Sequence, residues 1–264
     1  MFTLTDNKTI KLQARGILKG YRPRPALATV LFLAILLLFA FLRAKLSGAL
    51  DPVLLDQINE YSQAAAAGDI DSAMQHYAEA IELANSIELS FFHRAVITAI
   101  DLIRYIIIAG YVIFIMNCVR GSNPTVYNLL DGFAQFLKVL TVSLLRSIII
   151  SFLSVLLIVP GIIAAYTYRL ALFNLLDNPE MRVIDAMSLS RIMMRGHKMD
   201  LFKLDLNFIG YILLSLIFPP VLIYVIPYMY SSWVIFYDEL RKAEFPQGDL
   251  LDNGDSSSSS DEDQ

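Results

Sequence analysis

The chain has 264 residues and a mean hydropathy of +0.55, and 56% of its residues are hydrophobic. Soluble domains contain about 45–50% apolar residues, so this composition excludes an ordinary soluble globular protein. The formal net charge of −4 is segregated, because the first 25 residues are basic and the last 20 are acidic. The length fits one membrane domain rather than an array of soluble domains.

Residues 1–25 are predicted to form a basic cytoplasmic segment. Their lysines and arginines, against Asp6 alone, fit the excess of cations on the cytoplasmic side of membrane proteins. A second reading is that a short piece of this segment lies on an anionic membrane surface, so membrane lipid is an expected partner.

The first predicted transmembrane helix covers residues 26–43, which are almost purely Leu, Ala, Phe, Ile and Val. A cleaved signal peptide is the rival reading, because Ser47-Gly48-Ala49 is a small-residue site. Arg43 and Lys45 separate the apolar run from that site, which favours the membrane span.

Residues 46–92 are predicted to form an extracytoplasmic helical hairpin, because they hold eight acidic residues and neither Lys nor Arg. Asp51-Pro52 is a helix start signal, so a first helix is expected over 52–67. Gly68 ends that helix and Asp69 caps a second one that runs to about residue 85.

The second helix of this hairpin resembles the latter half of a tetratricopeptide repeat. The resemblance lies in Gly68-Asp69 with Tyr77, Ala80 and Leu83, and it covers about one repeat. A lone repeat cannot bury its own apolar face. Two readings follow: the hairpin packs closely on itself or on the membrane domain, or it binds a protein.

Residues 95–242 are predicted to form a five-helix membrane domain. Spans are expected at 95–116, 142–159, 162–176, 204–217 and 221–237, with an interfacial amphipathic helix at 127–141. Pro160-Gly161 is expected to turn the chain between the third and fourth spans. The whole chain is therefore predicted to be an all-α, polytopic bundle of six transmembrane helices with interfacial helices and an outer hairpin.

Four charged residues within the predicted spans form a candidate intramembrane cluster. They are Asp101, Arg104, Arg169 and Asp205. Asp101 and Arg104 share one helical face and can neutralise each other, or they lie near the outer interface. Arg169 needs Asp101, Asp205 or water; a buried pair, a polar cavity and a position nearer the interface are all open readings.

A candidate loop motif joins the fourth and fifth spans. It comprises Asp177, Asn178, Pro179, Arg191, Arg195, Gly196 and Lys198. Asp177-Asn178-Pro179 is expected to stop one helix, and the next starts near Met181 and ends at Gly196. We expect Asp177 and Asp205 to bracket this loop by accepting hydrogen bonds from its amides or from Arg and Lys.

The sequence contains no recognisable group of catalytic residues. Phosphate-binding, dinucleotide-binding, metalloprotease and serine-hydrolase motifs are missing, and the three histidines lie in three separate regions. Cys118, the only cysteine, reads as a buried inert thiol. We expect no enzyme activity, catalytic residue, cofactor or metal site, and no nucleic-acid partner.

The order of motifs across residues 100–240 resembles a bacterial membrane family catalogued as domain of unknown function nine-seven-five. The resemblance rests on Val159-Pro160-Gly161, Asp177-Asn178-Pro179, Ser190-Arg191, Met194-Arg195-Gly196-His197-Lys198 and Leu201-Phe202-Lys203-Leu204-Asp205, with Arg120-Gly121 and Gly132-Phe133. It implies a polytopic inner-membrane protein without an established activity, substrate or cofactor.

Two functions are compatible with these expectations. The first is a non-catalytic membrane scaffold or accessory factor whose working surfaces are 52–85, for a protein partner or for self-association, and 177–200. The second is a small-solute or lipid transporter that uses the intramembrane charges. Both place a multi-pass protein in the cell membrane with both termini inside, and residues 243–264 are predicted to be a disordered acidic, Ser-rich tail.

Overall fold

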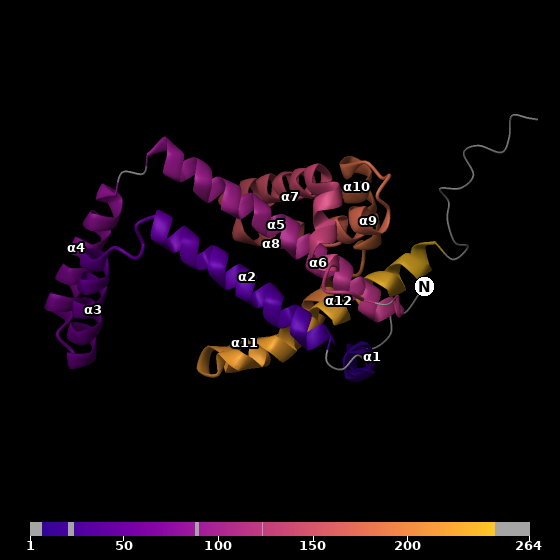
Figure 1. Cartoon of the computed structure of the whole chain (residues 1–264), viewed down its shortest axis with the longest axis horizontal. Helices are drawn as coiled ribbons and strands as arrows, with labels where there is room; N and C mark the ends of the chain where they lie inside the picture. Colours follow the sequence, from indigo (N-terminus) through magenta and orange to yellow (C-terminus); the bar gives the residue numbers. More distant parts are fainter. Residues whose placement is uncertain (1–6, 21–23, 88–89, 123, 246–264) are drawn as a thin grey trace, which may run out of the picture. The chain divides into compact units, whose positions relative to one another are not determined.

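A computed structural model describes residues 7–20, 24–87, 90–122 and 124–245 of the chain (Figure 1). All regular elements within those ranges are helices, which confirms the predicted all-α class. The predicted acidic tail lies outside the described residues from position 246 onward, as do residues 1–6 and 21–23 of the basic segment.

The chain divides into two compact units, and each is described by itself. One unit is Val30–Ile107, and the other combines Met1–Thr29 with Ile108–Gln264. Two long helices, α2 (Arg24–Leu46) and α5 (Phe91–Arg120), pass from one unit into the other.

The smaller unit contains the predicted hairpin, formed by α3 (Pro52–Ala67) and α4 (Ile70–Ser86). The backbone N–H of Val53 donates to Asp51 Oδ1 at 2.9 Å, and Pro52 occupies the first helical position. Gly68 adopts φ +77°, a left-handed conformation that glycine tolerates, and Asp69 then caps α4. The helix boundaries predicted from these four residues are confirmed.

The larger unit holds the remaining helices. They are α1 (Asn7–Gly20), α6 (Asn128–Asp131), η1 (Gly132–Gln135), α7 (Phe136–Leu156), α8 (Ile158–Thr167), α9 (Ala171–Asp177), α10 (Val183–Met193), α11 (Lys198–Ile217), η2 (Pro219–Val221) and α12 (Leu222–Glu244). Part of its core lies where α7, α9 and α10 meet, at Val142, Ala171, Leu175, Ala186 and Met187.

Within the described residues, five segments are long and apolar enough to cross a membrane. They are Pro25–Leu46, Phe91–Arg120, Asn128–Leu156, Ile158–Asp177 and Pro219–Glu244. These segments indicate a multi-pass membrane protein. The predicted fifth span, now α11, is not among them, because four charged residues fall within its first eight positions.

The predicted position of the turn between the third and fourth spans, Pro160-Gly161, is wrong. The chain turns at Leu157, whose φ of −158° and ψ of 140° are extended, while Pro160 lies in the first turn of α8. Proline fits there because its missing N–H has no intrahelical partner in the first turn. Gly161 is needed for packing, since a Cβ at this position would lie 2.9 Å from Ser154 Cα on α7.

The predicted amphipathic helix at 127–141 also has different boundaries. Residues 128–135 form the short elements α6 and η1, and α7 begins at Phe136 and continues without interruption to Leu156. The polar residues in 127–141 mark one face of this segment, but they do not set a boundary at residue 142, because helical hydrogen bonding continues through an amphipathic pattern.

The basic segment contributes α1, a 14-residue helix that packs on α12 and α11. Ile10 and Ala14, four positions apart, are fully buried against these helices. Lys11 Nζ donates to Asn207 Oδ1 at 3.3 Å, and Arg15 Nη2 donates to the Tyr211 hydroxyl at 3.2 Å. Part of the predicted membrane-surface segment is therefore attached to the helical domain itself.

Candidate functional site

The fourth predicted span is broken in its middle, which the sequence did not reveal. Helix α8 ends at Thr167, residues 168–170 form turns, and α9 begins at Ala171. The side chain of Ser190 on α10 compensates for the lost helical hydrogen bonds: its Oγ donates to the Thr167 carbonyl at 2.8 Å and accepts from the Leu170 N–H at 3.2 Å. Ser190 is fully buried, so these bonds satisfy backbone groups that water does not reach.

Helix α10 lies antiparallel to α9. Its C-terminal half contacts the break through Ser190, and its N-terminal half accepts a hydrogen bond from Asn174 Nδ2 at the Ala186 carbonyl, at 3.1 Å. Ala186 and Met187 are buried in the core, whereas Arg191 and Arg195 are exposed. Helix α10 therefore has one buried side and one exposed side.

Arg169 lies within the break and belongs to a cluster of four side chains, which we call the Arg169 cluster: Tyr166, Arg169, Asp205 and Trp233. Asp205 accepts from Trp233 Nε1 at 2.7 Å and from the Tyr166 hydroxyl at 3.1 Å. Arg169 Nη2 lies 3.9 Å from Asp205 Oδ2, and its Cζ lies 4.1 Å from the centre of the Trp233 ring. The guanidinium is therefore stabilised by both a carboxylate and an aromatic face.

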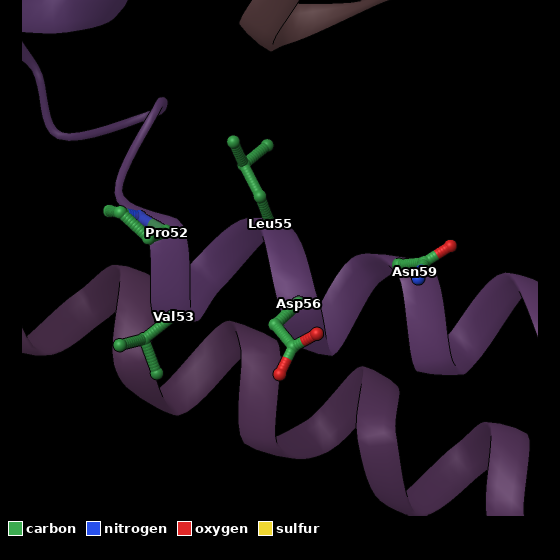
Figure 2. Close-up of a pocket in the computed structure, with 5 residues that line it drawn as sticks. All are labelled: Pro52, Val53, Leu55, Asp56 and Asn59. Carbon is green, nitrogen blue, oxygen red and sulfur yellow. The ribbon is translucent and has the colours of Figure 1, made fainter.

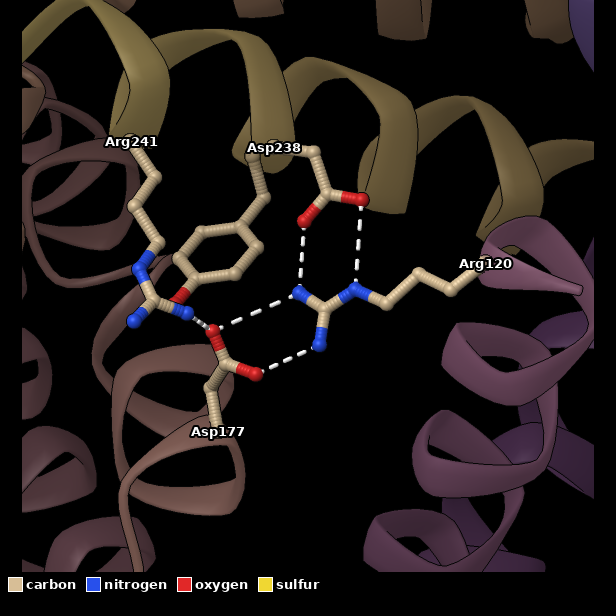
Figure 3. A network of polar contacts seen from close by, with 5 residues as sticks. Arg120, Asp177, Asp238 and Arg241 are labelled. Atoms are coloured by element: carbon tan, nitrogen blue, oxygen red, sulfur yellow. Dashed lines mark hydrogen bonds and ion pairs between the residues drawn. The ribbon is translucent and has the colours of Figure 1, made fainter. Parts of the chain in front are cut away.

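A second cluster joins the C-terminal ends of three helices, and we call it the Asp177 cluster: Arg120, Asp177, Tyr237, Asp238 and Arg241 (Figure 3). Arg120 is the last residue of α5, Asp177 is the last residue of α9, and the other three lie in the final turns of α12. The ion pairs of this cluster connect segments that are far apart in the sequence.

Asp177 is the centre of the second cluster, because its side chain is only 7% exposed. Its Oδ1 accepts a hydrogen bond from Arg120 Nη1 at 2.5 Å, and its Oδ2 accepts one from the Tyr237 hydroxyl at 3.0 Å. Arg241 forms a close ion pair with the same carboxylate. Arg120 also donates to Asp238 Oδ1 at 2.6 Å, so one guanidinium bridges two carboxylates.

The other predicted loop residues are positioned as follows. Asn178 follows the last residue of α9, and the Pro179 carbonyl accepts a hydrogen bond from Lys138 on α7. Gly196 has φ +87° in the turn after α10, and Lys198 begins α11. Asp177 and Asp205 both contact arginines, as predicted, but those arginines come from other helices rather than from the loop between them.

A local ion pair lies at the start of α10. Arg182 Nε donates to Asp185 Oδ2 at 2.8 Å, and this hydrogen bond holds the pKa of Asp185 below its ordinary value. Both side chains are largely exposed, so the pair adds little to stability.

The predicted pair of Asp101 and Arg104 belongs to the smaller unit. Arg104 Nη2 lies 3.9 Å from Asp101 Oδ1, and Arg43 Nε of α2 lies 3.5 Å from Asp101 Oδ2. The structure therefore resolves the four predicted intramembrane charges into two pairs, one in each unit.

The sequence reasoning missed Tyr237 and Arg241 as partners of Asp177. It also missed Asp238 as a partner of Arg120, which entered only through the family resemblance. A signal was available, because all four lie at or near the predicted inner ends of spans. Ser190 had a weaker signal: it is a small polar residue beside the apolar side of an amphipathic helix.

The motifs around α8–α12 determine what the chain is similar to. Residues 153–244 match the model of the family described as "Protein of unknown function (DUF975)". The predicted family resemblance is confirmed over this DUF975 segment, which is shorter at its N-terminal end than the predicted 100–240. No curated protein and no solved structure matches the chain. The DUF975 segment contains the whole Arg169 cluster and all of the Asp177 cluster except Arg120.

In chemical terms, both clusters are assemblies of paired charges. Within the described residues, no group of three His, Cys, Asp or Glu side chains has a metal-binding arrangement. Arg120, Arg169 and Arg241 each face a carboxylate, an arrangement that fixes helices relative to one another.

Proposed function

We propose that this protein is a six-span, non-catalytic scaffold or accessory factor of the cell membrane, with both termini on the cytoplasmic side. The observation that carries the proposal is the pairing of the charges within the DUF975 segment. Arg169 is paired with Asp205, and Arg120 and Arg241 are paired with Asp177. Charges used in this way join helices, and the protein surface is left for binding.

The Asp177 cluster supports the six-span topology. It brings the C-terminal ends of α9 and α12 together through Arg120, so both ends lie at the same depth relative to the membrane. The chain leaves this depth after Asp177 and returns to it near Asp238. Helix α12 has 23 residues, about 34 Å at 1.5 Å per residue, and so its start lies on the far side of a ~30 Å core. The chain must cross before α12 begins, and α11, with 20 residues, is long enough to do so.

The charges at the start of α11 are compatible with this helix crossing the membrane. Lys198, Asp200 and Lys203 lie in its first two turns, at the level where a helix enters the headgroup region. Asp205 is deeper and has Arg169, Tyr166 and Trp233 as partners, which lowers the cost of its burial.

Cation placement supports the orientation. Arg120, Arg191, Arg195 and Arg241 lie in or beside the loops that are proposed to face the cytoplasm, whereas residues 46–93 contain neither Lys nor Arg. This asymmetry follows the positive-inside rule.

Cysteine labelling in intact cells tests the topology. In a Cys118→Ser background, single cysteines are placed by Phe218→Cys between α11 and α12, by Ser86→Cys at the end of the hairpin and by Ser188→Cys on α10. An impermeant maleimide is expected to label positions 218 and 86 in intact cells, and 188 only after permeabilisation. If position 218 instead behaves as 188 does, α11 is not a span and the six-span proposal is refuted.

Crosslinking in native membranes tests the scaffold. We expect the purified protein to bring down a specific protein partner through 52–85 or 177–200, and this partner must be lost when the surface concerned is substituted. A preparation that retains one defined lipid and no protein partner would contradict the scaffold.

The break at residues 168–170 favours a transporter as a second candidate. Interrupted transmembrane helices form the substrate sites of many transporters, and here Arg169 lies at the interruption. Trp233, the only tryptophan, stacks on Arg169 and so reports directly on this position. If small carboxylates or phosphate change its fluorescence in the wild type but not in Arg169→Gln, and vesicle uptake is lost in the same variant, the transporter is favoured over the scaffold.

A further inference from the structure

The hairpin presents an apolar face formed by both of its helices. We call it the hairpin face and define it by Ile58 and Tyr61 of α3 and Ile70, Met74, Tyr77 and Ile81 of α4. On α4 these residues recur at intervals of four, three and four, which places them on one side of the helix. The rings of Tyr61 and Tyr77 lie 5.9 Å apart, so the two helices contribute to one continuous face.

The hairpin face is exposed even though it is apolar. Ile70 is 74% exposed, Met74 63% and Tyr77 52%, whereas Ala73 on the side of α4 that packs on α3 is 6% exposed. Two antiparallel helices bury only the surfaces between them, so an apolar side of this kind needs a third element to cover it.

Acidic residues border the hairpin face on α4 and determine what can cover it. Seven acidic residues occur from Asp51 to Glu82, and the hairpin contains neither Lys nor Arg. Asp71 and Glu82 are exposed and follow Ile70 and Ile81 directly, so on α4 they lie along the outer side of the face. This apolar surface with an acidic border is complementary to a cationic amphipathic helix.

We propose that the hairpin face binds a cationic amphipathic helix of another protein. The stretch from Ile70 to Ile81 covers about 16 Å at 1.5 Å per residue, or three turns of a partner helix. Apolar residues of the partner at intervals of three and four cover the face, and its Lys or Arg residues lie against Asp71 and Glu82. This inference rests on the proposed scaffold function and names the class of its partner.

Two other occupants fit the charges less well. A second copy of the hairpin would bring like-charged surfaces together, which disfavours self-association. Helices that lie on lipid carry Lys and Arg on their polar side to contact headgroups, and this hairpin has none.

A pocket elsewhere on α3 does not compete with this interpretation. Its lining residues are Pro52, Val53, Leu55, Asp56 and Asn59 (Figure 2). They all come from one helix, and the pocket shares no residue with the hairpin face.

The test uses the full chain in phosphatidylcholine nanodiscs and a fluorescent synthetic helix of about 18 residues, with leucines at intervals of three and four and lysines elsewhere. Binding is followed by fluorescence anisotropy, with empty nanodiscs subtracted. We expect at least tenfold weaker binding for Met74→Asn with Ile81→Asn. The matched control is Val53→Asn, which changes an exposed apolar residue five positions from Ile58, on another side of α3, and is expected to alter binding less than twofold.

The charge contribution is tested separately. Asp71→Asn with Glu82→Asn is expected to weaken binding severalfold and to reduce its dependence on salt, and a peptide with Glu in place of Lys is expected not to bind. Amide exchange in α3 and α4 verifies that each variant keeps the hairpin folded. Equal binding of the Lys and Glu peptides, or unchanged binding in Met74→Asn with Ile81→Asn, overturns the proposal.

The other occupants give different results. If the wild type dimerises through the hairpin face and the Met74→Asn, Ile81→Asn variant does not, the occupant is a second copy. If a polarity-sensitive dye at Tyr77→Cys reports lipid before the peptide is added, the occupant is the membrane. Either result overturns the inference. A photocrosslinker at position 77 or 188 distinguishes failure of this inference from failure of the proposed scaffold function. A partner captured only from 188 refutes the inference and keeps the scaffold, whereas no partner from either position refutes both.

Discussion

Replacing Asp177 by Asn removes the charge at the centre of the Asp177 cluster while keeping the size of the side chain. Asp177 is 7% exposed and accepts from Arg120, Tyr237 and Arg241. Hydrogen bonds to charged groups contribute about 1.5–3 kcal/mol each, and breaking a fully buried ion pair costs about 3–5 kcal/mol. The two guanidiniums are 32% and 31% exposed, so water takes over part of the lost interaction. We therefore expect Asp177→Asn to lower the free energy of unfolding by about 2–3 kcal/mol.

The measurement is unfolding in detergent micelles, by SDS titration and by heat. A loss of this size corresponds to a melting temperature lower by roughly 4–12 °C for a chain of this length. Asp185→Asn is the matched control, because it breaks an exposed arginine pair and is expected to cost less than about 1 kcal/mol. A double-mutant cycle with Arg241→Gln should give a coupling energy of about 1 kcal/mol or more. Equal effects of the substitutions at 177 and 185 would refute the view that this cluster holds the helix ends together.

Three further predictions concern particular contacts. Gly161→Ala places a Cβ against the backbone of α7 and is expected to destabilise by about 1–3 kcal/mol, whereas Gly210→Ala, with open space around it, should be neutral or slightly stabilising. Ser190→Ala leaves a buried carbonyl and a buried N–H without a partner and should lower the free energy of unfolding by about 2–4 kcal/mol. The control Ser188→Ala, at an exposed position, should cost less than about 0.5 kcal/mol. Thermal unfolding tests the glycine pair and the serine pair. The hydrogen bonds from Ser72 lower the pKa of Asp69 below its ordinary 3.8. The cap therefore stabilises α4 above pH 3.8, and this stabilisation is lost as the pH falls through the lowered pKa. Amide exchange at the start of α4 should accelerate over this pH range in the wild type and not in Asp69→Asn.

The hairpin shows how much of the fold local sequence determines. Asp51, Pro52, Gly68 and Asp69 predicted both helices within one residue of the observed boundaries. Each of these residues acts on backbone groups within four positions of itself, through a side-chain cap, a fixed φ or a tolerated positive φ. No distant contact is needed for such predictions, and none changed them.

The fourth span shows where local reasoning failed. Residues 162–176 are apolar apart from Arg169 and a few polar residues, and they contain no Pro or Gly to mark an interruption at 168–170. The break is possible because Ser190, twenty positions beyond Leu170, satisfies the freed backbone groups. A helix that gives up hydrogen bonds in an apolar environment needs such a partner, and the sequence of the span cannot show whether one is present.

The sequence alone determined that the chain contains several segments apolar enough to cross a membrane, that its secondary structure is helical and that Asp177-Asn178-Pro179 ends a helix. These properties follow from composition and from interactions between residues close in the chain. Only the tertiary structure decided which charges pair, because Asp177 lies 57 positions from Arg120, and Arg120 lies 118 positions from Asp238. A carboxylate buried in a membrane protein requires a partner, but its choice among several arginines depends on which helix ends meet.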